Sequence, residues 1–446
     1  MDGRAQHNAL NVLSEYIKYK SVSGNEKPAA EYMQKLCQSF GFKITIFSES
    51  DSSYNFAASL LPLDNKLPSI VFTNHIDVVP VDEKGPWIYP PFSGKIHKDT
   101  IYGRGAIDMK GPAVMQLFAL KQIKDSVSLT NLKYNIVILF LSGEETGGEN
   151  GAAKIIQQDI ITHLNALVVF GEGGGGLTNI VPGKERDLCF FVSNAEKKSL
   201  WLKLEATVKS RGHGSVPSSK TANRLLLKAI QKIEKTESRI FIDKTTEITF
   251  KTLGNIIGGG KGFIVRHINW WIFKPLRRNI LRHNEALNTL VTNSYQLTQI
   301  QNPQGGAINQ VAQTATAYYD CRLLPNKSEK PVFMKLLFHI VDPRIKITVL
   351  DESPEAGASD LNEHYENMAK AIKTVFPAAH VIPVTFPATT DNSYFRSINI
   401  NSFGVLPFQL NEEMLESVHS SNEKLPVKAL KDGIGVYISL MKFYTR

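Results

Sequence analysis

The sequence predicts an α/β protein with a mostly parallel sheet, helices on both faces of that sheet, and a smaller inserted α+β domain. Three observations support this prediction. Helical and strand-like patterns alternate up to about residue 195, which is typical of parallel strands joined by helices. The pattern then changes to alternating strands with amphipathic helices between them. After about residue 356 the first pattern returns, so the smaller unit interrupts the larger one.

The first part of the chain contributes the elements of the larger domain in turn. Residues 26–40 have the pattern of an amphipathic helix that ends at Gly41. Short apolar runs that suit buried strands are KITIF (43–47), SIVFT (69–73), YNIVILFL (134–141) and ALVVF (166–170). Helical patterns occupy MKGPAVMQLFALKQI (109–123) and GAAKIIQQDII (151–161). Strands separated by segments of this length predict parallel neighbours.

The inserted part has its own alternation of strands and helices. In LWLKLEATVKS (200–210), apolar residues fall on one face of a strand. Helix, strand, helix and strand patterns follow at TANRLLLKAIQKIEK (221–235), TATAYYDCRLL (314–324), KPVFMKLLFHIV (330–341) and RIKITVLD (344–351). The α/β pattern resumes with HYENMAKAIKTVF (364–376), SININ (397–401) and a closing helix, VKALKDGIGVYISLMKFY (427–444). We therefore expect one domain at 1–195 with 356–446, and the other at 196–355.

Composition narrows the classes of function. The 446 residues are 42% hydrophobic and 21% charged, which is ordinary for a globular protein. The net charge of +9 is spread along the chain without a nucleic-acid-binding motif, so we expect no nucleic-acid partner. The polar N-terminus has no apolar signal core, so the expected location is the cytoplasm unless a leader is missing from this sequence. The three cysteines are scattered and predict neither disulfides nor a zinc knuckle.

Residues with metal-binding side chains recur where predicted strands give way to loops. They are His75 and Asp77 after SIVFT, Asp108 before the helix at 109–123, Glu144 and Glu145 after YNIVILFL, Glu172 after ALVVF, and His419 before the closing helix. The carboxyl ends of neighbouring strands converge on one crevice in an α/β sheet, so these loops can meet. Nitrogen and oxygen donors together suit zinc, manganese or cobalt. Taken singly, each residue is more simply a helix cap, a solvated loop carboxylate or a core histidine.

Four sequence blocks carry a resemblance to a known family. HIDVVP, GRGAIDMKG, SGEETGG and VHSSNE match, in order, the signature blocks of the aminoacylase and carboxypeptidase family of two-zinc metallohydrolases, and the resemblance covers nearly the whole chain. It implies His75 and Glu172 as ligands of a first zinc, Glu145 and His419 as ligands of a second, and Asp108 as the bridge. Asp77 would orient His75, and Glu144 would be the general base. Gly171 stands where related sequences often carry Asp, which makes Glu172 the ligand with the weakest support.

The resemblance extends to the inserted domain, which matches the family's lid and dimerisation domain. In RGHGSVPSS, His213 takes the position of a histidine that reaches the partner's active site in a homodimer. Asn309 and Arg322 take the family's substrate-binding positions. An arginine there suits a carboxylate, because its planar group makes two parallel hydrogen bonds. The alternatives are a structural salt bridge for Arg322 and a buried turn histidine for His213. Thr390 and Asp391, in the Thr389–Asn392 loop, are further candidates for the substrate pocket.

The implied reaction is metal-assisted hydrolysis of an amide bond in a small substrate with a free carboxylate. Two Zn²⁺ ions per subunit, or Co²⁺ or Mn²⁺ in their place, would activate a bridging water as Glu144 takes its proton. The substrate is either an N-acyl amino acid or a short peptide, so an aminoacylase and a dipeptidase or carboxypeptidase both remain open. A peptide-binding scaffold without catalysis is a third reading, but such a descendant would have lost a ligand or Glu144.

Residues 268–300, INWWIFKPLRRNILRHNEALNTLVTNSYQLTQI, and the Asn309 block after them resemble one branch of this family, that of carboxypeptidase S and the N-fatty-acyl amino acid hydrolases. Within 261–285, positive charges are interleaved with Trp, Phe and Ile. Such a segment can contact a membrane or cover an acyl chain. A lid helix with an ordinary apolar face explains the same pattern.

Overall fold

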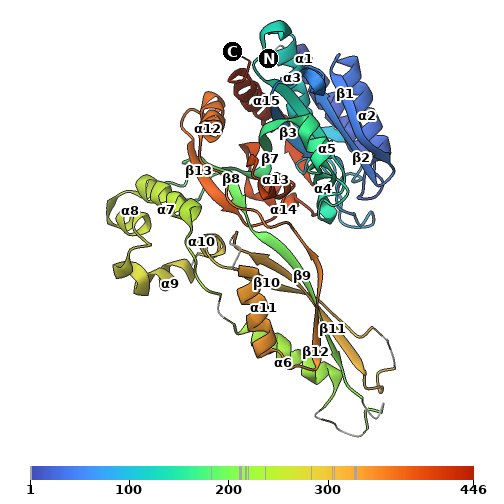
Figure 1. Cartoon of the computed structure of the whole chain (residues 1–446), viewed down its shortest axis with the longest axis vertical. Helices are drawn as coiled ribbons and strands as arrows, with labels where there is room; N and C mark the ends of the chain where they lie inside the picture. Colours follow the sequence, from blue (N-terminus) through green and yellow to red (C-terminus); the bar gives the residue numbers. More distant parts are fainter. Residues whose placement is uncertain are drawn as a thin grey trace.

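The computed structural model of the chain describes residues 3–181, 183–209, 213–215, 218, 220–236, 238–282, 284–303, 305, 307–325 and 329–445. Two sheets of different size dominate these residues, and both termini lie at the end formed by the larger one (Figure 1). None of the helices in the described ranges combines the length and apolar character needed to cross a membrane.

The larger sheet has eight strands within the described residues. Their order is β1 (Lys43–Ser50), β2 (Ser53–Ser59), β6 (Asn135–Leu141), β3 (Ser69–His75), β7 (Ala166–Leu177), β14 (Asn401–Gln409), β8 (Cys189–Glu196) and β13 (His380–Phe386). The central strands β6, β3, β7 and β14 run parallel, whereas β1 and β2 are antiparallel to their neighbours. This confirms the predicted α/β class with a mostly parallel sheet.

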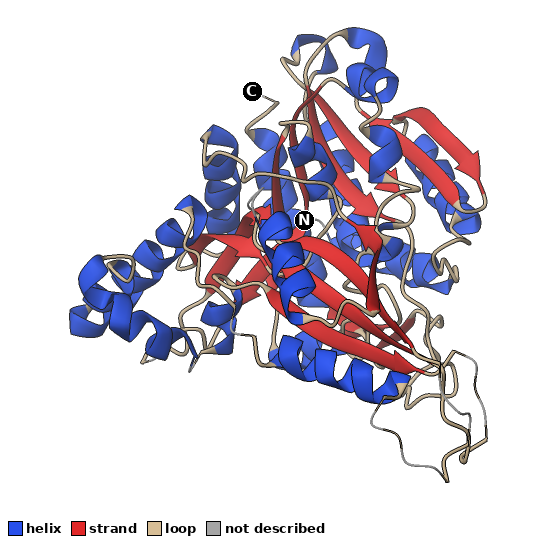
Figure 2. Ribbon diagram, turned by 60° about the horizontal axis from the view of Figure 1, so that its bottom comes forward, coloured by secondary structure: helices blue, strands red, loops and turns tan. Residues whose placement is uncertain are grey.

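Helices cover both faces of this sheet, because alternate strand residues point to opposite sides. Ile70 and Phe72 of β3 belong to one apolar core, and Val71 between them belongs to the other. The first core is closed by α1 (Gly3–Lys18), α2 (Lys27–Ser39), α3 (Lys110–Lys124), α12 (Glu363–Val375) and α15 (Val427–Lys442). The second is closed by α4 (Ala152–Ile155), α5 (Gln158–Leu164) and α13 (Asn392–Ser397). The layers are visible in Figure 2.

The smaller sheet is antiparallel and has helices beside it. Its strand order is β10 (Ser294–Gln301), β11 (Thr314–Leu323), β9 (Lys198–Thr207) and β12 (Ile345–Glu352). The apolar face of β9 packs with α6 (Ala222–Glu234) and α11 (Glu329–Ile340) in a separate core. Four further helices, α7 (Lys244–Ile257), α8 (Gly259–Arg266), α9 (Lys274–Arg282) and α10 (Glu285–Thr289), project to one side (Figure 1). The boundaries at 195 and 356 stay a prediction.

A third, three-stranded sheet joins two distant loops of the chain. It consists of β15 (Lys424–Pro426), β5 (Thr100–Tyr102) and β4 (Lys95–His97), with β5 in the middle. It ties the segment just before Asp108 to the segment just after His419 and α14 (Glu412–Ser417). Residues more than 300 positions apart are thereby held side by side.

Some sequence expectations were wrong in detail. β1 was expected to be buried, but it is an edge strand with partly exposed side chains, because β2 is its one partner among the strands that the structure describes. The predicted helix at 151–161 is divided into α4 and α5. SININ mostly precedes β14, which begins at Asn401. The strand predicted at ALVVF (166–170) does not end there but runs on to Leu177.

Candidate metal centre and substrate cavity

The parallel strands bring the predicted ligands to one edge of the larger sheet. His75 is the last residue of β3, which pairs with β6 on one side and β7 on the other. Glu144 and Glu145 lie in a 3-10 turn directly after β6. Gly143 precedes this turn and has a positive φ of 73°. Asp108 lies just before α3, in the loop that leads to the helix.

Two further ligand candidates reach the same edge in other ways. Glu172 lies within β7, where we expected a loop after the strand. The backbone there remains paired with β14, and glycines allow the close approach of the two strands; a Cβ on Gly173 would come within 2.8 Å of the main-chain carbon of Gly404. His419 follows α14 in the left-handed region, with a φ of 58°.

Two histidines share the carboxylate of Asp108. His75 Nε2 lies 2.9 Å from Asp108 Oδ1, and His419 Nε2 lies 3.0 Å from Asp108 Oδ2. Glu172 Oε2 is 3.8 Å from His75 Nε2, and Glu145 Oε2 is 3.2 Å from His419 Nε2. The donors therefore form two neighbouring sets with Asp108 between them. This is the grouping that the family resemblance implied, and its assignment to metals stays a prediction.

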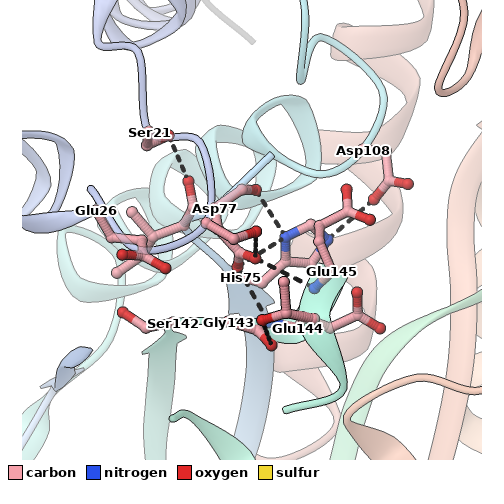
Figure 3. A network of polar contacts seen from close by, with 12 residues as sticks. Ser21, Glu26, His75, Asp77, Asp108, Ser142, Gly143, Glu144 and Glu145 are labelled. Carbon is pink, nitrogen blue, oxygen red and sulfur yellow. Dashed lines mark hydrogen bonds and ion pairs between the residues drawn. The ribbon is translucent and has the colours of Figure 1, made fainter. Parts of the chain in front are cut away.

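Asp77 holds His75 and the Glu144–Glu145 turn, although not by the contact we expected. His75 Nδ1 lies 2.9 Å from the main-chain oxygen of Asp77 and 3.6 Å from its carboxylate, so the carbonyl is the hydrogen-bond acceptor (Figure 3). The carboxylate instead accepts the N–H groups of Glu144 and Glu145, both at 3.1 Å, and the hydroxyl of Ser23 at 2.8 Å. Asp77 therefore leaves His75 Nε2 facing Asp108 and fixes the adjacent turn.

Negative charge is concentrated at this site. Burial raises the pKa of Glu144 well above its usual range, and the nearby charge of Glu172 raises it further. Burial, with a contribution from Asp108, raises the pKa of Glu172 to about 7. Burial alone would also raise the pKa of Asp108, but hydrogen bonds with His419 and His75 hold it well below its usual range. The carboxylates thus outnumber the positive groups that face them.

The residues present fit divalent metal ions. Ligand atoms of His75, Asp108 and Glu145 all lie within 4.8 Å of one another, and so do those of His75, Glu144 and Glu172. Glu145 Oε1 is buried without a hydrogen-bond partner among the described residues, which is the state expected of an oxygen that binds a cation. Imidazole with several carboxylates suits zinc, cobalt or manganese.

A buried ion pair that sequence reasoning missed joins the Asp108 and His419 loops. Glu423 accepts the N–H groups of Gly105, Ile107 and Asp108 at 2.9, 2.8 and 3.1 Å, and Arg104 Nη1 at 2.7 Å. Arg104 Nη2 donates to the Ser420 oxygen at 3.0 Å. The sequence did contain a clue to this pair, because Arg104 lies in the block GRGAIDMKG and Glu423 in the block VHSSNE.

A cavity of about 810 Å³ opens beside the metal-ligand cluster. Asp108, Glu144, Glu145, Glu172 and His419 form part of its wall. Most of the remaining wall is apolar and comes from several elements: Leu177, Ile180, Phe191, Leu253, Leu287, Leu290, Val384, Phe386, Leu406, Leu410, Leu415 and Val418. The cavity is therefore acidic where it meets the cluster and mostly hydrophobic elsewhere.

Three of the predicted substrate-binding residues line this cavity. Arg322 lies near the end of β11, with Nη1 3.3 Å from Thr389 Oγ1 and Nε 2.9 Å from Asp320 Oδ1. Asp391 also lines the cavity, and burial raises its pKa well above the usual range. Thr390 lines it too, but its hydroxyl donates to Glu196 at 2.7 Å, which favours a role in shaping the loop.

The remaining two predicted residues do not reach the cluster of their own chain. His213 and Asn309 lie together, and the N–H of Gly214 donates to the Asn309 oxygen at 2.7 Å. They flank the ends of β9 and β11 that point away from the larger sheet, whereas Arg322 is at the opposite end of β11 (Figure 1). Within one chain, Asn309 and Arg322 therefore cannot hold one carboxylate. A role for His213 in a partner's site stays a prediction, which a monomer in sedimentation velocity would contradict.

Comparisons with known proteins agree on one family. The family model described as Peptidase family M20/M25/M40 matches residues 71–442. The N-fatty-acyl-amino acid synthase/hydrolase PM20D1 of Mus musculus is 28% identical over 403 residues, which is 89% of this chain and 78% of that protein. Probable carboxypeptidase S-like 2 of Dictyostelium discoideum is 28% identical over 406 residues, or 90% of this chain and 75% of that protein. The crystal structure of the M20 family metallo-carboxypeptidase Sso-CP2 from Sulfolobus solfataricus covers 100% of both chains, with a TM-score of 0.72 and 21% identity.

Proposed function

The chain belongs to peptidase family M20/M25/M40 and is a hydrolase of that family, and we propose that it hydrolyses N-acyl amino acids with medium or long acyl chains, using two zinc ions. The observation that carries this choice is the apolar cavity of about 810 Å³ beside Glu144. Binding of a hydrocarbon chain against such a wall is stabilised by about 0.8 kcal/mol for each CH₂ group removed from water. The short side chain of a dipeptide would leave most of the cavity unfilled.

The residues of the cluster have two different roles in amide hydrolysis, metal binding and proton transfer. Bound divalent ions would lower the pKa of a water molecule and polarise the scissile carbonyl. His75, Asp108, Glu145, Glu172 and His419 are the residues that would hold them. Glu144 accepts the proton of the attacking water and returns it to the leaving amine, a role that suits a carboxyl group whose pKa burial has raised.

Arg322 is the residue that binds the free carboxylate of the substrate. Replacing it with Met removes a charge-assisted hydrogen-bond donor from the cavity wall, which costs about 1.5–3 kcal/mol. We expect KM for an N-acyl amino acid to rise about 10- to 100-fold with a small change in kcat, and little change for the matching amide, which has no carboxylate. Arg344→Met, which removes an exposed arginine paired with Asp342, is the matched control. An equal loss with the acid and the amide would contradict this role.

Two matched substrates test the choice of substrate class. We expect zinc-loaded protein to cleave a long-chain N-acyl amino acid with a kcat/KM at least about tenfold above that for a dipeptide with the same C-terminal residue. Leu290→Trp, which fills part of the cavity, should reduce cleavage of the long-chain substrate and spare the N-acetyl analogue. Leu227→Trp, at an exposed position of α6, is the control. Preference for the dipeptide, with no effect of Leu290→Trp, would make this protein a peptidase instead.

A further inference from the structure

The four helices α7 to α10 form a helical insert between β9 and β10, and this insert has two contrasting sides. Its inner side belongs to the substrate cavity, because Leu253 of α7, Leu287 of α10 and Leu290 line the wall. Helix α7 is fixed against the larger sheet, where Thr249 Oγ1 donates to the Pro383 oxygen of β13 at 2.6 Å. The insert is therefore a wall of the cavity.

The outer side of the insert exposes a group of large apolar side chains. Trp271 is 85% exposed, Ile272 56%, Trp270 51% and Phe263 43%. The ring of Trp270 lies 4.1 Å from that of His267 and 6.0 Å from that of Phe263, which makes a single aromatic surface. Exposure of such side chains to water is unfavourable, and a group of them on the surface marks a site that another apolar phase can cover.

The charge close to these aromatic residues in the sequence is positive. Residues 248–284 contain seven Lys and Arg and no Asp or Glu; Glu247 and Glu285 lie just outside this range, and Glu247 pairs with Lys251 at 2.7 Å. Lys261 and Lys274 are exposed, one in α8 and the other at the start of α9. An aromatic surface flanked mainly by cations complements the boundary between the headgroups and acyl chains of an anionic bilayer. A protein partner with an apolar patch would not by itself require this excess of positive charge.

We propose that the outer side of the helical insert docks on the surface of an anionic phospholipid bilayer. Trp270, Trp271 and Ile272 enter the interface, and Lys261 and Lys274 face the headgroups. Because the same insert forms a wall of the cavity on its other side, docking places the apolar cavity next to the lipid phase. An acyl substrate dissolved in the bilayer then has a short path to the cluster, and this last step rests on the proposed function.

Vesicle sedimentation tests the docking without metal or turnover. The full chain is mixed with phosphatidylcholine vesicles that contain, or lack, phosphatidylserine. We expect binding to the vesicles with phosphatidylserine, weakening as salt is added, and a loss of about tenfold or more in Trp271→Ser/Ile272→Ser and in Lys274→Glu. Val332→Ser/Phe338→Ser removes two apolar residues, 52% and 66% exposed, from α11 and should bind as the unchanged protein does.

The outcomes separate the docking from the proposed function. Failure of the unchanged protein to bind, equal binding to both kinds of vesicle, or binding that survives Trp271→Ser/Ile272→Ser would overturn the docking. Delivery of the substrate has its own readout. We expect Trp271→Ser/Ile272→Ser to cleave a long-chain N-acyl amino acid in vesicles about tenfold more slowly, and a soluble short-chain one at an unchanged rate. An equal rate with the vesicle-borne substrate would overturn the delivery step alone.

Discussion

Replacing Glu144 with Gln is expected to lower kcat by about 10²- to 10⁴-fold, because the side chain then cannot accept a proton. The change is nearly isosteric, and the Asp77 carboxylate still accepts the main-chain N–H of residue 144, so the turn keeps its position. The high pKa of Glu144 comes from burial and from Glu172, and both features suit a group that takes and returns a proton in each turnover. Steady-state kinetics on an N-acyl amino acid measures the loss.

Metal content decides what a loss of activity in this variant means. Glu144 lies with His75 and Glu172 in a set whose ligand atoms are within 4.8 Å of one another, so its position also suits a metal ligand. We expect the variant to bind as much zinc as the unchanged protein. A loss of metal would make Glu144 a ligand, and activity within about tenfold of the unchanged protein would remove it from the reaction. Glu149→Gln, at an exposed position of the same loop, is the matched control.

Removing the metal with a chelator is expected to abolish hydrolysis and to destabilise the fold. Ions that bind only the native state stabilise it by about 4 kcal/mol when their free concentration is 1,000 times the dissociation constant. Without these ions, no divalent charge offsets the crowded carboxyl groups, and those that are ionised repel one another. The groups are Asp108, Glu144, Glu145 and Glu172. Thermal unfolding before and after chelation measures the change, and zinc, cobalt or manganese added back one at a time identifies the ions that restore activity.

The metal-free protein should also show a pH dependence that the loaded protein lacks. In the absence of metal, the pKa of Glu172 rises from its ordinary value of 4.5 to about 7. The folded state then binds a proton more tightly than the unfolded chain does, so stability is lost as the pH rises from about 4.5 through about 7. A bound cation favours the ionised carboxylate and removes this dependence. Equal stability of both forms across that range would contradict a metal site at Glu172.

Much of the fold followed from local patterns in the sequence. Apolar runs such as YNIVILFL and SIVFT are buried on both faces in parallel strands, and that burial is what makes them continuous. KITIF was grouped with these runs but lies at the sheet edge. Its short pattern, in which Lys43 and Thr45 alternate with apolar residues, carries no information about how many neighbouring strands it will have. The strand through Gly171–Leu177 was missed because its glycines indicate a loop unless the neighbouring backbones are known.

The sequence by itself determined the chemistry of the site: imidazole and carboxylate side chains placed where parallel strands end, with an arginine and an apolar segment in the inserted part. Only the tertiary structure decided which oxygen of Asp77 supports His75, that Glu423 and Arg104 join two loops more than 300 residues apart, and that Asn309 lies far from Arg322. It also brought Leu253, Leu287 and Leu290 to a cavity beside Glu144. The physical reason is that residue type and spacing set what a side chain can bind, whereas its partners depend on contacts between segments that the chain order does not relate.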